Sequence, residues 1–515
     1  MNNRKLVFIL LLIFLFSLTF RIPIQGKYPK GYDTYTSYKL STDIKQKGYI
    51  GWVLNPLSLT GFIPISYPTG GILLLSILST ITETSIPIAI ILWNFVLILI
   101  LTFFIYLISF VIFKNKLVSF ITTLIYLNCR FLISYSDWFY SVRNLFLVLF
   151  IFLIWLFICK DLKNKFVLVL IVLLLMLITH RLVVVAVLII APYILSRFLK
   201  KEFVNSKYFL YLVLALSLLF LSVSFYFIAN LNVAPLIYSP IRTNIEYLDV
   251  IIDIIFRFCM QIGVITVLIP LGYAMLLFKK NKNEKDVFVI MTVTFFIPFL
   301  SETTYSFYLM LPFWIIAASY FFEYLLRLSY MSKSYLKIGV ICLIIISLIL
   351  PLFITVRESK SDITFVRDQT NSLKTYLLDK ADNEVVVCNY HEIYCDQLTA
   401  LSNNKIRTLS TLSDLMVADR YNISNWDIDI RLKQIFSFKD PILNKKYFDE
   451  LYSGYIIHWN LDSHLLSKII EFTKVGYILD SNNPDSLENR PILEKKFGDL
   501  NQIYDNGLQQ IKPLK

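Results

Sequence analysis

The sequence predicts a polytopic α-helical membrane protein with a C-terminal extracytoplasmic α/β domain, and three observations carry this prediction. Of the 515 residues, 57% are hydrophobic and only 17% are charged, whereas a soluble protein carries about 25% charged residues. Apolar runs at 6–20, 86–113 and 208–228 are long enough to cross a hydrocarbon core about 30 Å thick, which needs roughly 20 helical residues. From residue 357 the composition becomes that of a soluble protein. Because a backbone in lipid must satisfy its own hydrogen bonds, the long unbroken runs indicate helices.

The positive charge of the chain lies in its apolar part. Residues 1–356 hold 29 Lys and Arg against 13 Asp and Glu, whereas residues 357–515 hold 20 against 23. A basic excess confined to the membrane part is typical of loops that anchor a protein on the cytoplasmic side. It does not indicate a groove for a phosphate backbone, so we expect no nucleic-acid partner.

Six basic clusters predict how the chain crosses the membrane, because Lys and Arg gather in cytoplasmic loops. They hold 18 of the 29 positive residues of the apolar part, at Arg4 and Lys5; Lys114 and Lys116; Lys160, Lys163 and Lys165; Arg197, Lys200, Lys201 and Lys207; Lys279, Lys280, Lys282 and Lys285; and Arg327, Lys333 and Lys337. All six fall on the cytoplasmic side if the chain crosses about eleven times, near 5–20, 86–113, 117–134, 139–159, 165–179, 182–197, 208–229, 252–278, 286–300, 304–326 and 337–356. The N-terminus is then cytoplasmic, and a transmembrane domain at 1–356, with its first outer loop at 21–85, precedes an extracytoplasmic domain at 357–515.

Three apolar segments differ from an ordinary transmembrane span. The N-terminus is similar to a signal peptide, but no small-residue cleavage site follows it, so we expect a retained first span. The apolar segment 68–82 is too short to cross the membrane, and we interpret it as an interfacial or re-entrant helix. His180 and Arg181 interrupt an apolar run that, as one helix of about 30 residues, would measure about 45 Å. Two short spans joined by a tight charged turn are therefore favoured.

Asp33 is the first candidate for chemistry. It lies in the first outer loop, about a dozen residues past the first span and at the boundary between water and lipid. A carboxylate beside a low-dielectric surface suits the role of a general base. An ordinary solvated loop residue is the alternative that the spacing leaves open.

The residues around Asp33 resemble a known family. Gly31-Tyr32-Asp33-Thr34-Tyr35, followed by Leu40, Ile44 and Gly48, resembles the first outer loop of the C-type membrane glycosyltransferases, the GT-C superfamily, which includes protein mannosyltransferases and the catalytic subunits of oligosaccharyltransferases. Tyr67-Pro68-Thr69-Gly70 is similar to the bend that closes this loop. The resemblance covers residues 1–356 and the layout with a trailing outer domain, and its short motifs point to a superfamily rather than to a substrate.

This resemblance implies a reaction and its partners. Asp33 would be the catalytic carboxylate of an inverting glycosyltransferase in the membrane of the cell envelope. The enzyme would take a sugar from a polyprenyl-phosphate donor and transfer it to a lipid, glycan or protein acceptor on the extracytoplasmic face. Asp137, at the second outer turn, falls where metal-using members place acidic ligands, so that a divalent cation is a possible cofactor. Asp137 and Glu302, at the fifth outer turn, are thus acceptor-binding or metal-binding candidates.

Asp137 also has a structural reading. In the sequence Tyr135-Ser136-Asp137-Trp138, Ser136 or Asp137 can cap the helix that we expect from residue 139. The cap and the site role are compatible with each other.

Three basic or imidazole side chains are candidates for binding the donor phosphate. An Arg at the outer membrane face binds a phosphate with two hydrogen bonds, and a neighbouring His adds another. His180, Arg181 and Arg143 are assigned to this role. The alternative for His180 and Arg181 is that both side chains reach out to lipid headgroups. Asp253 and Arg257 have the i, i+4 spacing of an internal ion pair.

The outer domain shows alternating strand and helix patterns. We expect strands at 383–388, 405–409 and 454–459, helices at 392–401 and 463–472, and a terminal hairpin at 503–511. Cys388 and Cys395 can form a disulfide in an oxidising compartment.

Two other classes of function compete with the enzyme. A secondary transporter or a flippase of lipid-linked glycans would show inverted repeats and helices broken by Gly or Pro, and we find no internal repeat. A membrane receptor whose outer domain binds a partner is the third reading. The sequence has no Walker loop, no Gly-x-Gly-x-x-Gly and no Cys-x-x-Cys, which disfavours an ATP-driven transporter.

Overall fold

The structure is a computed structural model of the 515-residue chain. It describes residues 3–19, 21, 29–49, 53–54, 62–63, 69–159, 163–180, 182–230, 255–256, 258–263, 265–298 and 303–331, together with 339, 342, 345–346, 375, 378, 385–388, 397, 400–403, 407–409, 475–481, 504–505 and 509–513.

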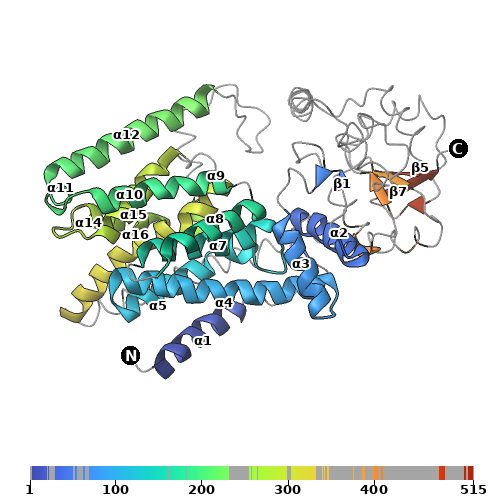
Figure 1. The fold of residues 1–515 in the computed structure, drawn as a ribbon, viewed down its shortest axis with the longest axis horizontal. Helices are drawn as coiled ribbons and strands as arrows, with labels where there is room; N and C mark the ends of the chain where they lie inside the picture. Colours follow the sequence, from blue (N-terminus) through green and yellow to red (C-terminus); the bar gives the residue numbers. More distant parts are fainter. Residues whose placement is uncertain are drawn as a thin grey trace.

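Most of the described residues are helical. The helices, in chain order, are α1 (Asn3–Thr19), α2 (Tyr32–Lys47), α3 (Gly70–Ile81), α4 (Ile86–Phe113), α5 (Lys116–Asn128), α6 (Arg130–Ser134), α7 (Val142–Ile158), α8 (Lys165–Thr179), α9 (Val183–Ala186), the 3-10 helix η1 (Val187–Ile189), α10 (Ile190–Phe198), α11 (Lys201–Val204), α12 (Lys207–Asn230), α14 (Ile265–Leu277), α15 (Glu284–Phe295) and α16 (Thr303–Met331). In Figure 1 they gather into a bundle, with α2 and α3 between the bundle and the strands β5 (Val475–Ser481) and β7 (Gln509–Pro513).

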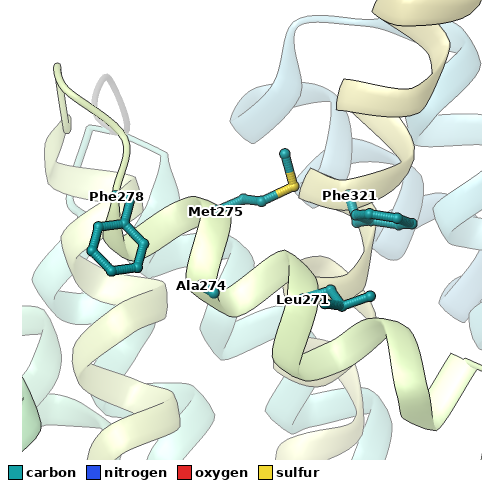
Figure 2. A pocket seen from close by; sticks show the side chains of 5 residues that line it. All are labelled: Leu271, Ala274, Met275, Phe278 and Phe321. Carbon is teal, nitrogen blue, oxygen red and sulfur yellow. The ribbon is translucent and has the colours of Figure 1, made fainter.

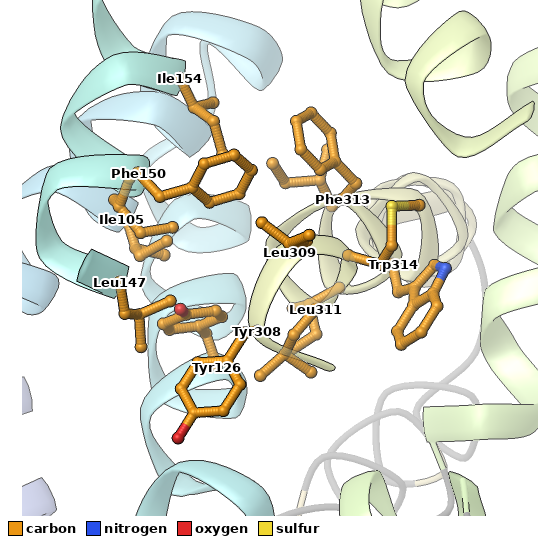
Figure 3. Packing of buried hydrophobic residues seen from close by; sticks show 14 of the residues in the cluster. Ile105, Tyr126, Leu147, Phe150, Ile154, Tyr308, Leu309, Leu311, Phe313 and Trp314 are labelled. Atoms are coloured by element: carbon orange, nitrogen blue, oxygen red, sulfur yellow. The ribbon is translucent and has the colours of Figure 1, made fainter. Parts of the chain in front are cut away.

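Helix α16 forms the centre of the bundle. From Phe307 to Ala318 every side chain is buried. Figure 3 shows this helix presenting Tyr308, Leu309 and Phe313 toward side chains of α4, α5 and α7. Because α7 is apolar on all its faces and mostly buried as well, these two helices fix the positions of their neighbours.

Other helices expose apolar side chains on one whole face. Along α8 only Val172, Met176 and Thr179 are buried, whereas Phe166 is 80% exposed. Soluble monomers rarely expose continuous apolar patches of this kind, so a lipid-facing surface accounts for it. Among the described residues, the helical segments Ile86–Phe113 and Phe307–Leu328 are long and apolar enough to cross a membrane. The total of about eleven crossings stays a prediction.

Several predicted spans match single helices. Helix α4 coincides with the span predicted at 86–113 and α8 with that at 165–179, and α12 lies within one residue of 208–229 at each end. Helix α3 confirms the short helix predicted in 68–82, and its 12 residues measure about 18 Å. The span predicted at 337–356 lies mostly outside the described residues.

Three other predicted spans are interrupted and are not single α-helices, and whether each crosses the membrane stays a prediction. The segment 117–134 breaks at Cys129, whose backbone is extended between α5 and α6. The segment 182–197 divides into α9, η1 and α10. Within 252–278, Gly263 has a φ of 79° and separates the helical residues 258–262 from α14. These breaks depend on tertiary partners and on a single glycine rather than on the apolar pattern.

Four of the six basic clusters meet at one end of the bundle. The contacts that join them are Arg197 Nη1 to Glu284 Oε2 at 2.8 Å, Lys285 Nζ to Val111 O at 3.1 Å, Lys282 N to Asn205 Oδ1 at 2.9 Å, and Lys165 Nζ to the centre of the Tyr193 ring at 5.0 Å. We call this the basic end, formed by residues 111–116, 163–165, 197–207 and 279–286. The alternation inferred from charge therefore agrees with the packing of these helices.

The C-terminal part contributes a mixed five-stranded sheet of order β4-β3-β5-β7-β6. Strand β3 (Val385–Cys388) pairs in parallel with β4 (Arg407–Leu409) and β5, whereas β7 pairs in antiparallel fashion with β5 and β6 (Tyr504–Asp505). A separate two-stranded pair, β1 (Val53–Leu54) and β2 (Phe62–Ile63), lies in the first outer loop. The strands predicted at 383–388 and 405–409 and the hairpin at 503–511 are confirmed. Strand β5, which joins the two halves of the sheet, was not predicted.

Much of the outer segment stays a prediction. The strand at 454–459, the helix at 463–472 and Cys395 lie outside the described residues, so the α/β domain as a whole and the disulfide are not tested. One contact places the described part of this segment beside the first outer loop. Gln46 Nε2, at the end of α2, donates to Asn403 O at 3.1 Å.

Candidate active site

Two segments more than 100 residues apart are bonded to each other at the end of the bundle opposite the basic end. Residues 29–35 begin α2, and residues 135–143 precede and begin α7. Lys30 N donates to Trp138 O at 3.1 Å, Lys30 pairs with Phe139 in a parallel bridge, and Tyr140 N donates to Thr34 Oγ1 at 2.8 Å. We call residues 29–35 and 135–143 the carboxylate end. Helix α7 spans about 25 Å between the two ends, since the carbonyl of Cys159 after its last turn accepts from Lys165 Nζ at 2.8 Å.

Asp33 lies in the first turn of α2 and not in a loop as the sequence suggested. Its Oδ2 accepts a hydrogen bond from Ser141 Oγ at 2.7 Å and lies 3.2 Å from Arg143 Nη1. Ser141 is also the N-cap of α7, so the carboxylate lies at the N-termini of two helices, where the helix dipoles favour negative charge. Within the described part of the chain Oδ1 makes no hydrogen bond, and the side chain is 30% exposed. Asp33 is thus held by one oxygen, and its side chain stays partly exposed.

Asp137 forms a second ion pair beside the first. Its Oδ2 lies 2.6 Å from Lys30 Nζ, and the two side chains are 20% and 10% exposed. The reading of Ser136 or Asp137 as a helix cap was wrong, because α7 begins at Val142 and Ser141 caps it. The start of α7 is delayed from the predicted residue 139 because Trp138 and Tyr140 are bonded to the start of α2.

A third cation lies against this turn. Arg21 Nε donates to Ser136 Oγ at 2.6 Å, and its two other nitrogens donate to Ser17 O at 2.6 Å and to Leu127 O. Arg21 thereby caps the carboxyl ends of α1 and α5, where a cation is favourable. Burial lowers the pKa of Arg21 to about 10, which leaves the guanidinium charged at neutral pH. Three cations, Arg21, Lys30 and Arg143, therefore accompany two carboxylates.

The backbone at this end adopts conformations that depend on the local packing. Trp138 has a φ of 47°, which costs a non-glycine residue about 1–2 kcal/mol. Gly31 has a φ of 91°, and a Cβ atom there would lie 2.2 Å from the ring of Phe139. Such strain gathers at functional sites. Gly31 is required both for its conformation and for the close approach of the two segments.

The other predicted site residues have mixed outcomes. His180 ends α8 and is 8% exposed, and its Nδ1 accepts from Leu182 N at 3.1 Å. The alternative that His180 reaches out to lipid is therefore wrong. Arg143 pairs with Asp33, and its assignment to the donor phosphate stays a prediction. Arg181 and Glu302 lie outside the described residues, as do Asp253 and Arg257, and the roles of these four stay predictions.

Sequence reasoning missed Lys30, Ser141 and Arg21. Lys30 directly precedes the loop motif Gly31–Tyr35, yet nothing in the local pattern shows that its partner lies 107 residues away. Ser141 carried a usable signal, because a Ser directly before an apolar helical run is a preferred N-cap.

An apolar groove of about 410 Å³ lies elsewhere, on α14 and α16. It is lined by Leu271, Ala274, Met275, Phe278 and Phe321 (Figure 2). None of these side chains is polar or titratable, and none belongs to the carboxylate end. This groove is not the candidate active site.

Comparison with solved structures identifies the fold. Archaeal oligosaccharyltransferase AglB from Archaeoglobus fulgidus, in complex with an inhibitory peptide and a dolichol-phosphate, aligns with a TM-score of 0.58 over 98% of this chain and 74% of its own, at 11% identity. ArnT from Cupriavidus metallidurans bound to undecaprenyl phosphate aligns with a TM-score of 0.55 over 100% of this chain and 99% of its own, at 9% identity. The chain has the GT-C fold. No family model and no curated protein sequence matches the chain.

The GT-C fold and the position of Asp137 raise the question of a metal. A structure of the Archaeoglobus fulgidus oligosaccharyltransferase in complex with Zn and sulfate aligns with a TM-score of 0.58 over 98% of this chain and 73% of its own, at 11% identity. In the described ranges of the present chain, no group of three or more His, Cys, Asp or Glu side chains is placed to hold a metal ion.

Charge also opposes a metal here. Each carboxylate already has a cationic partner, Lys30 for Asp137 and Arg143 for Asp33. Two unit charges 4 Å apart interact by about 4 kcal/mol at an effective dielectric constant of about 20, so the cationic partner cancels much of the attraction that each carboxylate alone would exert on a divalent cation. The described residues do not fit a metal, so we route no catalytic step through one.

Proposed function

We propose that this chain is an integral membrane glycosyltransferase that moves a sugar from a polyprenyl-phosphate donor to a lipid, glycan or protein acceptor. The observation that carries the proposal is the geometry of Asp33 within a GT-C fold. Ser141 and Arg143 fix one oxygen of this carboxylate, Oδ1 makes no hydrogen bond within the described residues, and the side chain is 30% exposed. That is the arrangement a general base needs, since it must be held in place yet reach a substrate proton.

The reaction would be a single displacement with inversion. Asp33 Oδ1 takes the proton of the acceptor hydroxyl while the acceptor oxygen forms a bond to C1 of the sugar. The bond between C1 and the phosphate oxygen breaks, and its electron pair stays on that oxygen, so polyprenyl phosphate leaves as a dianion. The proton then passes from Asp33 to water. Arg143 orients the base, and together with Lys30 and Arg21 it makes this end of the bundle positive toward the anionic donor.

The test is transfer by the detergent-purified full chain. Polyprenyl phosphates that carry tritium-labelled hexoses serve as donors, and a membrane extract serves as the acceptor source. We expect Asp33→Asn to lower transfer by about 100-fold or more, within the range for loss of a general base. The matched control is Asp43→Asn on the same helix, where Asp43 pairs with Lys47 at 3.0 Å, and it should transfer normally. A folded Asp33→Asn protein with full activity would contradict the assignment, whereas movement of the intact lipid without cleavage of the donor would favour a flippase.

We further propose that the basic end faces the cytoplasm and the carboxylate end faces outward. The clustering of Lys and Arg supports this orientation, since these residues gather on the cytoplasmic side. Glu83, in the turn before α4, and Lys280, after α14, are both exposed and lie toward opposite ends. Single-cysteine variants at these two positions should react with a membrane-impermeant thiol reagent from opposite sides of sealed vesicles. Labelling of both from one side would overturn the orientation.

A further inference from the structure

Lys30, in its ion pair with Asp137, is more restricted by hydrogen bonds and burial than a lysine in a surface ion pair. Both polar groups of the Lys30 backbone form hydrogen bonds. Its N–H donates to Trp138 O at 3.1 Å, and its carbonyl accepts from Thr34 Oγ1 at 2.6 Å. Its side chain is only 10% exposed, and the ammonium meets Asp137 at 2.6 Å. An exposed pair loses side-chain entropy when it forms, but here the packing has already restricted Lys30. The ammonium is held at the carboxylate before any substrate arrives.

The ammonium of Lys30 lies at the carboxylate for which the resemblance to the GT-C superfamily implies a metal-ligand role. Asp137 is the acidic residue of the second outer turn, and its Oδ2 is engaged by Lys30. The other carboxylate of the site is engaged by Arg143 and Ser141. A divalent cation that binds these Oδ2 atoms would have to displace Lys30 or Arg143, and one that binds the other carboxylate oxygens would still be repelled by both. The local balance of three cations to two carboxylates would also become more positive.

We propose that the Lys30 ammonium takes the place of a divalent cation at Asp137, so that this chain works without a metal. This inference rests on the proposed function, because it concerns how the same site receives its donor. With no metal, the phosphate of the donor is neutralised by side chains of the protein. The carboxylate end and the adjacent Arg21 together hold three cations and two carboxylates, so they carry one net positive charge. This charge balances the single negative charge of a phosphodiester, the class of a polyprenyl-phosphate sugar.

The first experiment measures metal directly and does not depend on activity. The full chain, purified without chelator, is analysed for Mg, Mn and Zn by mass spectrometry, and its thermal unfolding is followed with and without millimolar Mn²⁺. We expect less than about 0.1 metal ion per chain and no shift of Tm, because a ligand that binds only the native state would raise Tm. Stoichiometric metal, or a rise of Tm with Mn²⁺, overturns the proposal.

The second experiment removes the ammonium. In Lys30→Gln the carboxylate of Asp137 loses its counter-ion, and a cation from solution can then approach it. We expect Mn²⁺ to raise the Tm of this variant by roughly 2 °C or more, and we expect the effect to vanish when Asp137→Asn is added. A purely structural ion pair would lower Tm in Lys30→Gln without creating a response to Mn²⁺, and that result would overturn the proposal.

Transfer activity gives the third readout. The unmodified chain should keep its rate in the presence of EDTA. Lys30→Gln should lose roughly tenfold or more of the rate and recover part of it with Mn²⁺. The matched control is Lys47→Gln, because Lys47 also pairs with an Asp of the same region but is 40% exposed, and it should behave as the unmodified chain does. EDTA inhibition reversed by Mn²⁺ in the unmodified chain overturns the proposal.

The outcomes separate this proposal from the function on which it rests. If no labelled donor is consumed under any condition, the proposed function fails, and the metal content and the Tm measurements still decide whether Lys30 excludes a cation. If transfer is found and depends on a metal, the function stands and the role of Lys30 is wrong.

Discussion

The two ends of the helical bundle hold ion pairs of different kinds. At the basic end Asp286 is 1% exposed and accepts from Lys279 Nζ at 2.8 Å, from Tyr320 OH at 2.6 Å and from Asn283 N at 2.8 Å. Asn283 and Asp286 form a capping box at the start of α15. At the carboxylate end the two pairs instead join segments more than 100 residues apart, and both carboxylates keep some exposure.

This difference indicates what each set of charges does. The carboxylate of Asp286 is saturated by donors from Asn283, Lys279 and Tyr320, and with Asn283 it completes the start of α15. Asp33 is held at one oxygen only, and its partners come from another helix. We therefore expect changes at the basic end to affect stability and changes at the carboxylate end to affect transfer.

The largest effect is expected from the glycine that allows the carboxylate end to close. Gly31→Ala places a Cβ atom in a positive-φ position and against the ring of Phe139 at 2.2 Å. The conformation costs about 1–2 kcal/mol and the overlap about 1–3 kcal/mol, so Tm and transfer should both fall. The control is Gly48→Ala at the other end of α2, where φ is 78° and nothing lies within 4 Å, and only the first cost applies. Equal losses in the two variants would show that the approach of α2 to Phe139 is not needed.

A matched pair of arginines compares the two ends directly. Arg143→Ala removes the partner of Asp33, and since charge-assisted hydrogen bonds contribute about 1.5–3 kcal/mol, kcat/KM should fall about 10- to 100-fold. Arg197→Ala removes an exposed pair with Glu284 at the basic end, which contributes about 0.2–1 kcal/mol, and transfer should be unchanged. If Arg197→Ala reduces kcat/KM as much as Arg143→Ala does, the separation of roles between the ends is wrong.

The sequence predicted the long helices well and the interruptions poorly. Helices α4 and α8 follow from unbroken apolar runs that end at Lys114 and His180, where the pattern itself changes. The break at Cys129 has no such signal, because Arg21 supplies the hydrogen bond that the carbonyl of Leu127 would have received in a continuous helix. A residue 106 positions away thus decides where α5 ends.

The candidate site was predicted as separate residues and not as a constellation. Asp33 was singled out from the loop motif, but its place in a helix was missed because the N-cap, Gly31, makes no side-chain capping bond and the first turn has no apolar periodicity. Asp137 and Arg143 were also singled out, each with a different role from the contact observed. The pairing of cations with carboxylates is a long-range property, for which local patterns of residues carry no signal.

The buried carboxylate of Asp286 tests whether charges at the basic end affect stability and not transfer. Asp286→Asn keeps the size of the side chain, but its single oxygen can accept from only one of Asn283 N and Tyr320 OH, which meet different carboxylate oxygens, and it loses the charge that Lys279 meets. We expect a loss of about 1–2 kcal/mol in the free energy of unfolding, measured by thermal unfolding in detergent, with transfer per folded molecule within about threefold. A selective loss of transfer with unchanged Tm would place chemistry at the basic end.

The smallest effect on transfer is expected at Ser141, whose hydroxyl has two roles. Ser141 caps α7 and donates to Asp33 at 2.7 Å, whereas Asn115 at the basic end caps α5 and only accepts from Leu117 N and Val118 N. Loss of either cap should cost about 1 kcal/mol, so Ser141→Ala and Asn115→Ala should lower Tm to a similar extent. Only Ser141→Ala should also reduce kcat/KM, by roughly fivefold, because about 1 kcal/mol of hydrogen bonding to the base is removed. Equal kcat/KM values in the two variants would show that Arg143 alone positions Asp33, since the change in stability common to both variants cancels from the comparison.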